Sequence, residues 1–201
     1  MTIDSLEQLR GLYPMPKERA VRKQLSAMDV HCRRFIALSP FVVLASSSKA
    51  GAMDASPRGG APGFVKTLDG KTVLIPDAPG NNRLDTLENI IGTGRIGLLF
   101  LIPGVDETLR VNGSCRLLDD LEVLKGLSDE KRMPKLVIEV KVEDVYLHCA
   151  KALMRSKLWS AESQVERAVL PTMGQMLNDQ TGIRTMPESQ EQMIERYKAD
   201  L

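Results

Sequence analysis

The chain has 201 residues, and its 27 lysines and arginines nearly balance its 26 aspartates and glutamates. A chain without an excess of positive charge attracts nucleic acid weakly, so we expect no nucleic-acid partner. Its longest apolar runs are far shorter than the roughly 20 residues that a membrane-spanning helix needs, and its charged N-terminus lacks the apolar stretch of a signal peptide. We therefore expect a cytoplasmic protein with no membrane partner.

The residues that most often hold metals or perform acid–base chemistry are scarce. Cys32, Cys115 and Cys149 are widely spaced without a C-x-x-C motif, and His31 and His148 are the two histidines. This pattern predicts neither a disulfide framework nor a metal site, and no triad, H-E-x-x-H or G-x-S-x-G motif identifies a catalytic residue. We expect Cys115, which lies inside a predicted strand, to pack in the core.

The first part of the chain predicts a helix followed by a hairpin. Apolar residues recur at steps of three and four over residues 17–38, which indicates one amphipathic helix. Residues 41–45 are typical of a buried strand, and residues 49–52 are typical of a turn into a second strand at 53–56. The Gly- and Pro-rich segment 56–64 predicts a fixed loop where a ligand can approach the backbone.

A strand, a loop and a helix follow, and their junction is suited to an anion. Residues 72–75 predict the strand, and Asn82, with Asp85 three residues later, predicts the N-cap of the helix. Free backbone N–H groups at this helix start, together with Arg83, would suit a phosphate dianion. The alternative interpretation is an ordinary capped helix whose arginine faces solvent.

The remaining pattern favours a mainly β fold. About six strands with few intervening helices indicate a mainly antiparallel barrel, whose closure would remove exposed edges. Gly113 predicts a β-bulge. The further predicted strands are 95–102, 107–118 and 136–147, and the further predicted helices are 119–127, 161–177 and 188–197.

A set of polar and aromatic residues remains as the candidate binding site. Arginines donate to phosphate, backbone groups of segments 64–65 and 75–76 can meet the edge of a heterocycle, and Trp159 offers a plane for stacking. Such a set suits a ligand with a phosphate and a flat aromatic part, and the cofactor would then supply the chemistry. The polar members are Arg58, Asn81, Asn82, Arg83, Arg110 and the basic segment 155–159.

Six segments, in this order along residues 17–159, resemble the pyridoxamine 5′-phosphate oxidase-like flavoproteins, and in particular a bacterial subgroup of FMN-dependent enzymes. The segments are Ser39-Pro40-Phe41, Ser56-Pro57-Arg58-Gly59, Pro62-Gly63-Phe64, Ile75-Pro76-Asp77 with Gly80-Asn81-Asn82-Arg83, Leu109-Arg110-Val111-Asn112-Gly113, and the run from His148 to Ser156.

The resemblance implies a six-stranded antiparallel split β-barrel over residues 39–159, preceded by a helical segment at 1–38 and followed by a helical extension at 160–201. It implies a homodimer that holds FMN at the subunit interface and acts as an oxidoreductase on a small organic substrate, which the sequence does not identify. Two alternatives stay open. The protein is a non-catalytic flavin-binding or sensing protein, or it uses F420 or haem in place of FMN.

The resemblance also implies roles for individual residues. Arg58 and the pair Asn82-Arg83 would hold the phosphate, although Leu84 stands where the oxidases have a lysine, so Lys66 or Arg110 would have to compensate. Segments 64–66 and 75–77 would flank the isoalloxazine ring. Thr108 takes the place of a glutamine near the ring, and His148 that of a tryptophan. The implied cofactor-binding residues are Arg58, Phe64, Val65, Lys66, Ile75, Pro76, Asp77, Asn81, Asn82, Arg83, Leu84, Thr108, Arg110, His148, Arg155, Ser156 and Trp159, and no catalytic residue is assigned.

Overall fold

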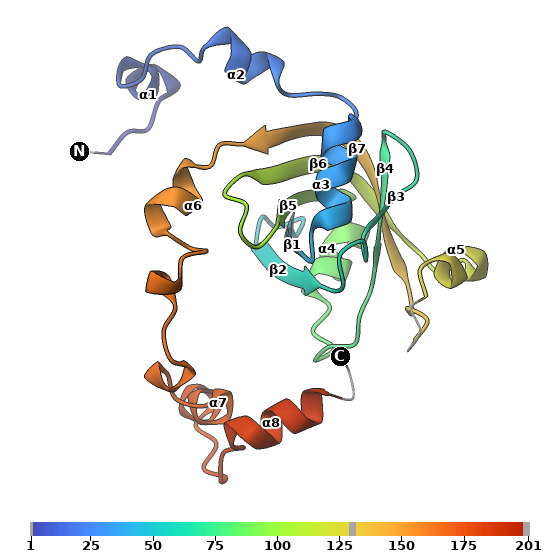
Figure 1. Ribbon diagram of the computed structural model, residues 1–201, viewed down its shortest axis with the longest axis vertical. Helices are drawn as coiled ribbons and strands as arrows, with labels where there is room; N and C mark the ends of the chain where they lie inside the picture. Colours follow the sequence, from blue (N-terminus) through green and yellow to red (C-terminus); the bar gives the residue numbers. More distant parts are fainter. Residues whose placement is uncertain (1, 129–131, 199–201) are drawn as a thin grey trace. The chain divides into compact units, whose positions relative to one another are not determined.

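The computed structural model describes residues 2–128 and 132–198 (Figure 1). The chain divides into two compact units, Met1–Arg155 and Ser156–Leu201. The first unit contains the β-sheet and most of the helices, and it is the unit in which a candidate site can be built. The boundaries at residues 38 and 159 that the sequence suggested stay predictions.

The centre of the first unit is one antiparallel sheet of seven strands in the order β2-β1-β5-β6-β7-β4-β3. In the described part of the chain no pairing joins β2 to β3, so the sheet is open. The prediction of a mainly antiparallel β fold is confirmed, whereas the sheet has seven strands instead of six and is not a closed barrel. The strands are β1 (Phe41–Ser47), β2 (Met53–Gly59), β3 (Lys66–Thr67), β4 (Thr72–Pro76), β5 (Arg95–Leu101), β6 (Thr108–Leu118) and β7 (Val137–His148).

Two strand predictions needed correction. The strand β3 has two residues, Lys66 and Thr67, which is too short for an alternating pattern to be visible. Residues 56–59, expected in an irregular loop, belong to β2, because they pair in register with β1 from Phe41↔Gly59 to Leu44↔Ser56. A strand at the edge of a sheet tolerates the proline that made this segment resemble a loop.

The helices of the first unit are α1 (Leu6–Gly11), α2 (Glu18–Arg22), α3 (Val30–Leu38), α4 (Asp85–Thr93), α5 (Leu121–Gly126) and α6 (Lys151–Ser156), the last of which ends at the first residue of the second unit. The prediction of one helix over residues 17–38 is wrong, because the chain leaves the helix after Arg22. Leu25 forms an isolated bridge with Val145, and the Asp29 carboxylate caps α3 by accepting from the Cys32 N–H at 2.8 Å.

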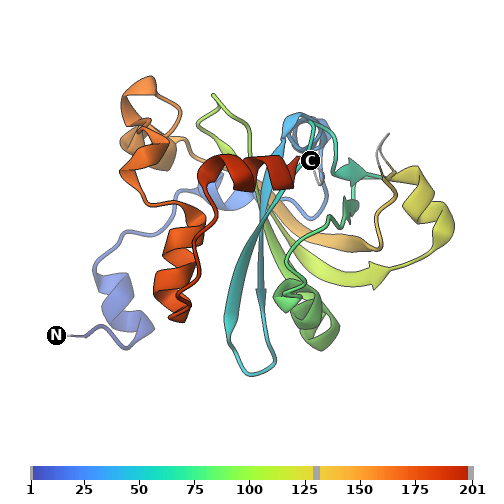
Figure 2. The ribbon, with the colours of Figure 1, turned by 90° about the horizontal axis from the view of Figure 1, so that it is seen from below.

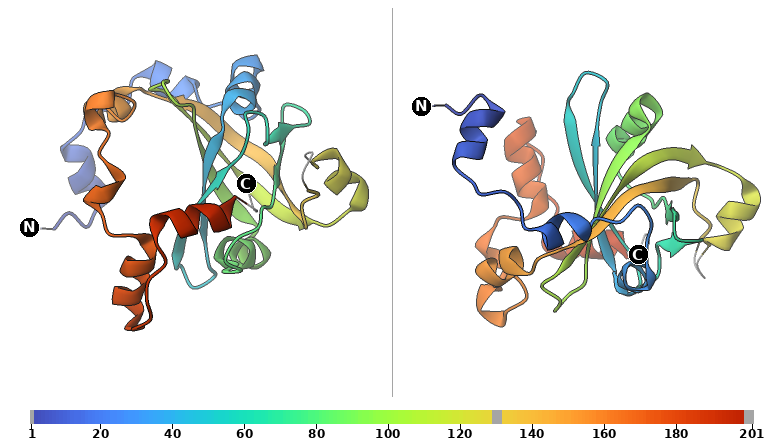
Figure 3. Two further views of the ribbon diagram at one scale, coloured as in Figure 1. Left: turned by 60° about the horizontal axis from the view of Figure 1, so that its bottom comes forward. Right: turned by 90° about the horizontal axis from the view of Figure 1, so that it is seen from above.

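The core lies between α3, α4 and the inner face of the sheet. Its fully buried side chains include Ile36 of α3, Leu44 of β1 and Phe100 of β5, and Cys115 packs against it as expected. The pairing of β6 with β7 shifts register between Asn112 and Gly113, which confirms the predicted bulge. The bulge bends the two longest strands, and α5 follows the end of β6 (Figure 3).

The second unit contains short helices, and none of its described residues is buried. Its elements are η1 (Ala161–Ser163), η2 (Arg167–Val169), α7 (Met173–Thr181) and α8 (Gln190–Tyr197). The prediction of one helix over residues 161–177 is therefore wrong. Pro171 separates η2 from α7, and the Thr172 hydroxyl caps α7 by accepting from the Gln175 N–H. Within the residues that the structure describes, no helix is long and apolar enough to cross a membrane.

Candidate functional site

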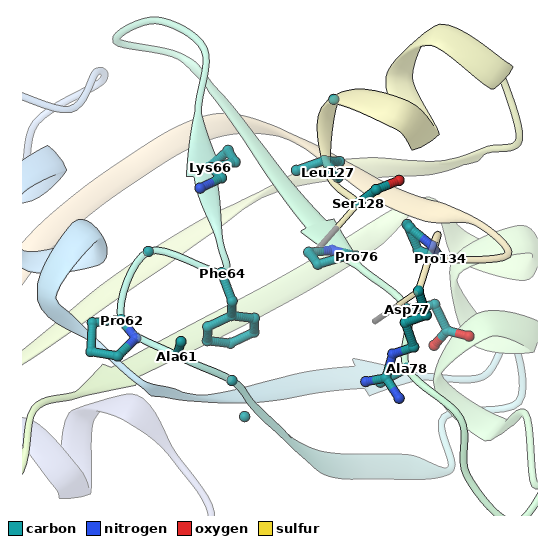
Figure 4. Close-up of a pocket in the computed structure, with 15 residues that line it drawn as sticks. Ala61, Pro62, Phe64, Lys66, Pro76, Asp77, Ala78, Leu127, Ser128 and Pro134 are labelled. Carbon is teal, nitrogen blue, oxygen red and sulfur yellow. The ribbon is translucent and has the colours of Figure 1, made fainter. Parts of the chain in front are cut away.

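A cavity of about 310 Å³ opens in the first unit, where three segments meet (Figure 4). The walls are the loop after β2, the end of β4 with the residues that follow it, and the segment between α5 and β7. Its lining residues are Gly59, Gly60, Ala61, Pro62, Gly63, Phe64, Lys66, Pro76, Asp77, Ala78, Gly126, Leu127, Ser128, Arg132 and Pro134.

The glycine-rich loop after β2 forms the first wall. The Gly60 N–H donates to the Pro40 carbonyl at 3.1 Å, and the Phe64 N–H donates to the Ala61 carbonyl at 2.9 Å, which closes a tight turn. A Cβ atom at Gly60 would lie 2.8 Å from Phe64 Cβ and Cγ, so only glycine leaves room for the phenyl ring. Glycine at position 60 therefore fixes where Phe64 stands in the pocket wall.

The second wall is held by the pairing of β4 with β7. Pro76 pairs with Val137, and the Asp77 N–H donates to the Leu136 carbonyl at 3.0 Å, so the backbone beyond β4 is fixed against β7. Ile75 is 0% exposed and Val65 is 2% exposed. Both residues belong to the core, and neither lines the pocket.

The third wall comes from the last residue of α5 and from four described residues between α5 and β7, none of which the sequence predicted as part of a site. It contributes Gly126, Leu127, Ser128, Arg132 and Pro134, and Figure 4 shows Leu127, Ser128 and Pro134 on the side of the pocket near Pro76 and Asp77. The Gly and Pro residues mark a loop in the sequence, but nothing local predicts that it returns to β4. The sheet pairing alone brings the segment there.

The pocket combines apolar surfaces with a few charges. Phe64, Pro62, Pro76 and Leu127 supply the apolar part, while Lys66 and Arg132 are cationic and Asp77 is anionic. This mixture is typical of a small-molecule site, in which apolar groups bury the ligand and a few polar groups orient it. Among the described residues that line the pocket, none is His or Cys.

The predicted phosphate site at the start of α4 differs from expectation. The N-cap of α4 is Leu84, not Asn82, and no side chain caps the helix. Asn82 has a left-handed backbone with φ 59°, and the Asn81 carboxamide accepts from the Arg83 N–H at 3.0 Å. A turn before the helix therefore replaces the side-chain cap, and in the part of the chain that the structure describes the N-cap residue makes no side-chain hydrogen bond to the first N–H groups of α4.

The Arg83 guanidinium already has an anionic neighbour. Its Nε atom lies 2.8 Å from Asp85 Oδ2, and its side chain is 78% exposed. The hydrogen bond with Asp85, with a smaller contribution from Asp54, raises the pKa of Arg83. A ligand anion would compete with Asp85 for this side chain. The exposed ion pair therefore lowers the affinity that the start of α4 could have for a phosphate.

A polar network anchors α4 beside the β1–β2 hairpin, an arrangement that Figure 2 shows from below. The Thr86 hydroxyl donates to Asp54 Oδ2 at 2.5 Å, and the Asn89 amide donates to the Ser46 hydroxyl at 3.0 Å. Arg58, which is half-buried, lies two residues after Ser56 and four residues after Asp54 on β2. The side chains of these three residues therefore point to the same face of the strand. Its Nη1 atom donates to the Pro57 carbonyl at 2.9 Å.

Another group of side chains lies on the outer face of β6 and β7. Arg110 Nη1 donates to Tyr146 Oη at 2.7 Å, and Lys23 Nζ lies 5.4 Å from the centroid of the Tyr146 ring. The His148 ring centroid is 5.5 Å from that of Tyr146, and Thr108 pairs with His148 across the strands. We call Lys23, Arg110, Tyr146 and His148 the Tyr146 cluster. Burial, Arg110 and Lys23 together lower the pKa of His148.

The structure thus brings only part of the predicted set into the pocket. Phe64, Lys66, Pro76 and Asp77 line it. Arg155 is exposed on α6, whereas Ser156 and Trp159 belong to the second unit. The predicted residues that the described lining does not include are Arg58, Val65, Ile75, Asn81, Asn82, Arg83, Leu84, Thr108, Arg110, His148, Arg155, Ser156 and Trp159. Lys23 and Tyr146 were missed, because no local pattern relates them to Arg110. Across the described ranges, no group of three or more His, Cys, Asp or Glu side chains is placed to hold a metal ion.

Comparison with known proteins gives a family match and distant structural neighbours. The family described as pyridoxamine 5′-phosphate oxidase matches residues 28–149. The structure is similar to that of HupZ from Group A Streptococcus, with 17% identity, a TM-score of 0.50 and coverage of 60% of this chain and 93% of HupZ. At that identity the likeness shows the fold alone. No curated protein matches the sequence.

Two further structures are similar at lower scores. An FMN-binding protein from Syntrophomonas wolfei has 14% identity and a TM-score of 0.46, with coverage of 58% of this chain and 83% of that chain. An FAD-binding protein from Mycobacterium smegmatis has 12% identity and a TM-score of 0.43, with coverage of 62% of this chain and 97% of that chain.

Proposed function

The chain belongs to the pyridoxamine 5′-phosphate oxidase family, and on that premise we propose that it is an FMN-dependent oxidoreductase acting on a small organic substrate. The observation that supports the proposal best is the pocket between the loop after β2 and the end of β4. Phe64 and Lys66 reach it from one of the two segments expected to flank a flavin, and Pro76 and Asp77 from the other.

The donor set of the pocket fits a flavin ring. Phe64, Pro62 and Pro76 offer apolar surface for the flat faces of the ring, and the cations Lys66 and Arg132 suit its electron-rich edge. Bound FMN would supply the hydride or electron transfer, whereas these residues bind the ring, orient it and exclude water from it. No residue of the pocket is assigned as an acid or base.

In this proposal the phosphate lies toward the start of α4. Backbone N–H groups of the first helical turn donate to it, and Arg58 and Arg83 supply positive charge. Because Arg83 also pairs with Asp85, we assign most of the phosphate affinity to the backbone groups and less to the guanidinium.

We also propose that two copies of the chain associate through the outer face of β1 and β5. Phe41, which is 37% exposed, pairs with Leu101, and Val43 pairs with Leu99, so four apolar side chains are neighbours on the face opposite the core. Such a patch on a sheet surface is typical of an interface. The measurement is the molar mass in solution by light scattering, where a monomer at micromolar concentration would contradict the dimer.

The test of the pocket is a titration of flavin fluorescence with purified protein. We expect FMN to bind, and Lys66→Gln to weaken binding by about five- to tenfold, because a charge-assisted contact is lost. Lys71→Gln is the matched control, since Lys71 is an exposed lysine of the same β3–β4 hairpin outside the pocket lining. Unchanged FMN fluorescence with the wild-type protein, or equal losses in both variants, would refute this assignment.

Two measurements separate the alternatives. The absorption spectrum of the freshly purified protein distinguishes FMN from F420 and haem, and the absence of His and Cys among the described lining residues favours a flavin over haem. Stopped-flow reduction of bound FMN by a nicotinamide donor then distinguishes an oxidoreductase from a sensing protein. Tight binding without reduction and reoxidation would favour the sensor.

A further inference from the structure

The two longer helices of the second unit, α7 and α8, are held together by polar contacts. Asn178 Nδ2 donates to the Thr185 carbonyl at 2.7 Å, and Nε and Nη2 of Arg196 donate to the Glu188 carboxylate at 3.0 and 2.8 Å. A Cβ atom at Gly174 would lie 2.8 Å from the Glu188 nitrogen, so glycine lets α7 approach the segment before α8. The pair therefore has a defined internal shape.

We call residues 172–198, which are the two helices with their caps, the C-terminal hairpin. Its apolar side chains are uncovered, since Met186 is 97% exposed, Leu177 of α7 is 49% exposed and Ile194 of α8 is 47% exposed. Helices of nine and eight residues are marginal in water, and packing of an apolar face is what stabilises them in proteins. The hairpin has the shape of a folded element without the burial that would stabilise it.

The second unit contains no other means of stabilising so small a fold. Units of this size usually need disulfides, a metal ion or association with another chain. The three cysteines of the sequence lie outside this unit, and none of its described residues belongs to a group that could hold a metal ion. Association therefore remains as the source of stability.

The exposed area of the chain indicates how much association is needed. The chain exposes 14188 Å², whereas a compact chain of 22.2 kDa exposes about 9,400 Å², which is about 4,800 Å² less. Two units of one chain bury about 1,500 Å² at most against each other, so about 3,300 Å² is left for another chain. Each chain of an obligate homodimer buries about 1,000–2,500 Å² or more. The excess is therefore too large for contacts within one chain and matches a large obligate interface.

We propose that the C-terminal hairpin packs its apolar face on a second copy of the chain. An element that is stable only when it is covered needs a partner in equal amount, and a second copy is always synthesised with it. The hairpin lies beyond residues 28–149, which match the family. The inference rests on the homodimer of the proposed function and adds a segment that crosses between the copies. In a two-fold dimer each hairpin covers the other copy, so both contacts form together.

The experiment detects contacts between copies by NMR on the full chain. One copy is deuterated except for ¹³C-labelled methionine methyl groups, the other copy is unlabelled, and the two are equilibrated to form mixed dimers. We expect nuclear Overhauser effects from the methyl groups of Met173 and Met186, both exposed in the single chain, to protons of the unlabelled copy. A protonated chain with the same methyl label reports contacts within and between copies together.

Two results would overturn the proposal. Contacts of Met173 and Met186 that occur in the protonated sample but not in the mixed dimers would show that the hairpin covers its own chain. Methyl signals at the positions of free methionine in both samples would show a hairpin that nothing covers.

Variants test which side of the hairpin makes the contact. Leu177→Gln and Ile194→Gln should each weaken the dimer by about tenfold or more, measured by sedimentation over a dilution series. Glu195→Gln is the matched control, because Glu195 lies on the polar side of α8 and its ion pair with Lys198 is exposed, so the dimer should be unchanged. Equal dimer affinity in all three variants would also overturn the proposal.

The hairpin and the proposed function can fail separately. Contacts between copies in a protein that does not bind FMN would leave the hairpin assignment intact and refute the flavin assignment. FMN binding by a dimer without hairpin contacts between its copies would do the reverse.

Discussion

Replacing Gly60 with alanine tests the geometry of the pocket wall directly. A Cβ atom at this position would lie 2.8 Å from Phe64 Cβ and Cγ and 3.2 Å from Cδ2, closer than carbon atoms approach without displacement. The contact is with the base of the side chain, so Phe64 cannot avoid it by rotating its ring alone. Overpacking of this kind costs about 1–3 kcal/mol. Because Phe64 is only half-buried, we expect the lower part of that range.

The expected result is a loss of about 1–2 kcal/mol in the free energy of unfolding and a roughly tenfold weaker affinity for FMN. Urea denaturation measures the first quantity and flavin fluorescence the second. Gly80→Ala is the control, because a Cβ atom there meets nothing within 4 Å. We expect this control to leave both quantities unchanged.

A double-mutant cycle identifies the contact responsible. In a Phe64→Gly background, which removes Cβ together with the ring, the added methyl group at position 60 has no side chain of residue 64 to displace, so Gly60→Ala should cost less stability than it does in the wild-type protein. The coupling free energy should be about 1 kcal/mol. Additive effects of the two substitutions would refute the reasoning that Phe64 and Gly60 determine each other's position.

Two further substitutions test the sheet. Glu139→Gln should cost about 1 kcal/mol at pH 7, since Glu139 accepts from Arg116 at 2.5 Å and lies 3.3 Å from Lys141. These two cations lower the pKa of Glu139 from its ordinary 4.5, so its stabilisation is complete above that value and is lost as the pH falls through the lower pKa of the folded state. Thermal unfolding at pH 7 and pH 2.5 should therefore show the wild type and the variant converging in acid, and a constant difference would contradict this. Gly113→Ala should abolish folding, because its Cβ atom would lie 2.0 Å from the Lys141 carbonyl oxygen, whereas Gly126→Ala has open space. Circular dichroism of the two soluble fractions measures this, and a folded Gly113→Ala protein would show that the bulge can shift.

Several parts of the fold are predictable because their signals are local. The strands β1, β5, β6 and β7 were expected within one or two residues, since each alternates buried and exposed residues or is continuously apolar. The bulge at Gly113 was predicted from a glycine inside a strand pattern. These features depend on a few consecutive residues.

Other predictions were wrong because a distant contact overrides the local pattern. The apolar periodicity over residues 17–38 continues through Leu25, yet the helix ends at Arg22 and Leu25 pairs with Val145 instead. Asn82 has the chemistry of an N-cap, but the turn in which its neighbour Asn81 accepts from Arg83 displaces the helix start to Leu84. Propensity is a weak prior where tertiary contacts are available.

For the candidate site too, some features are predictable from the sequence and others depend on the tertiary structure. The sequence by itself determined which residue types are present: the glycines of the segment after β2, the lysines and arginines, the scarcity of histidine and the family to which the chain belongs. Only the tertiary structure decided that Arg132 faces the same pocket as Phe64, and that Lys23 stands over Tyr146. Residues more than 60 and 120 positions apart meet through strand pairing, and no local pattern of side chains encodes where a strand finds its partner.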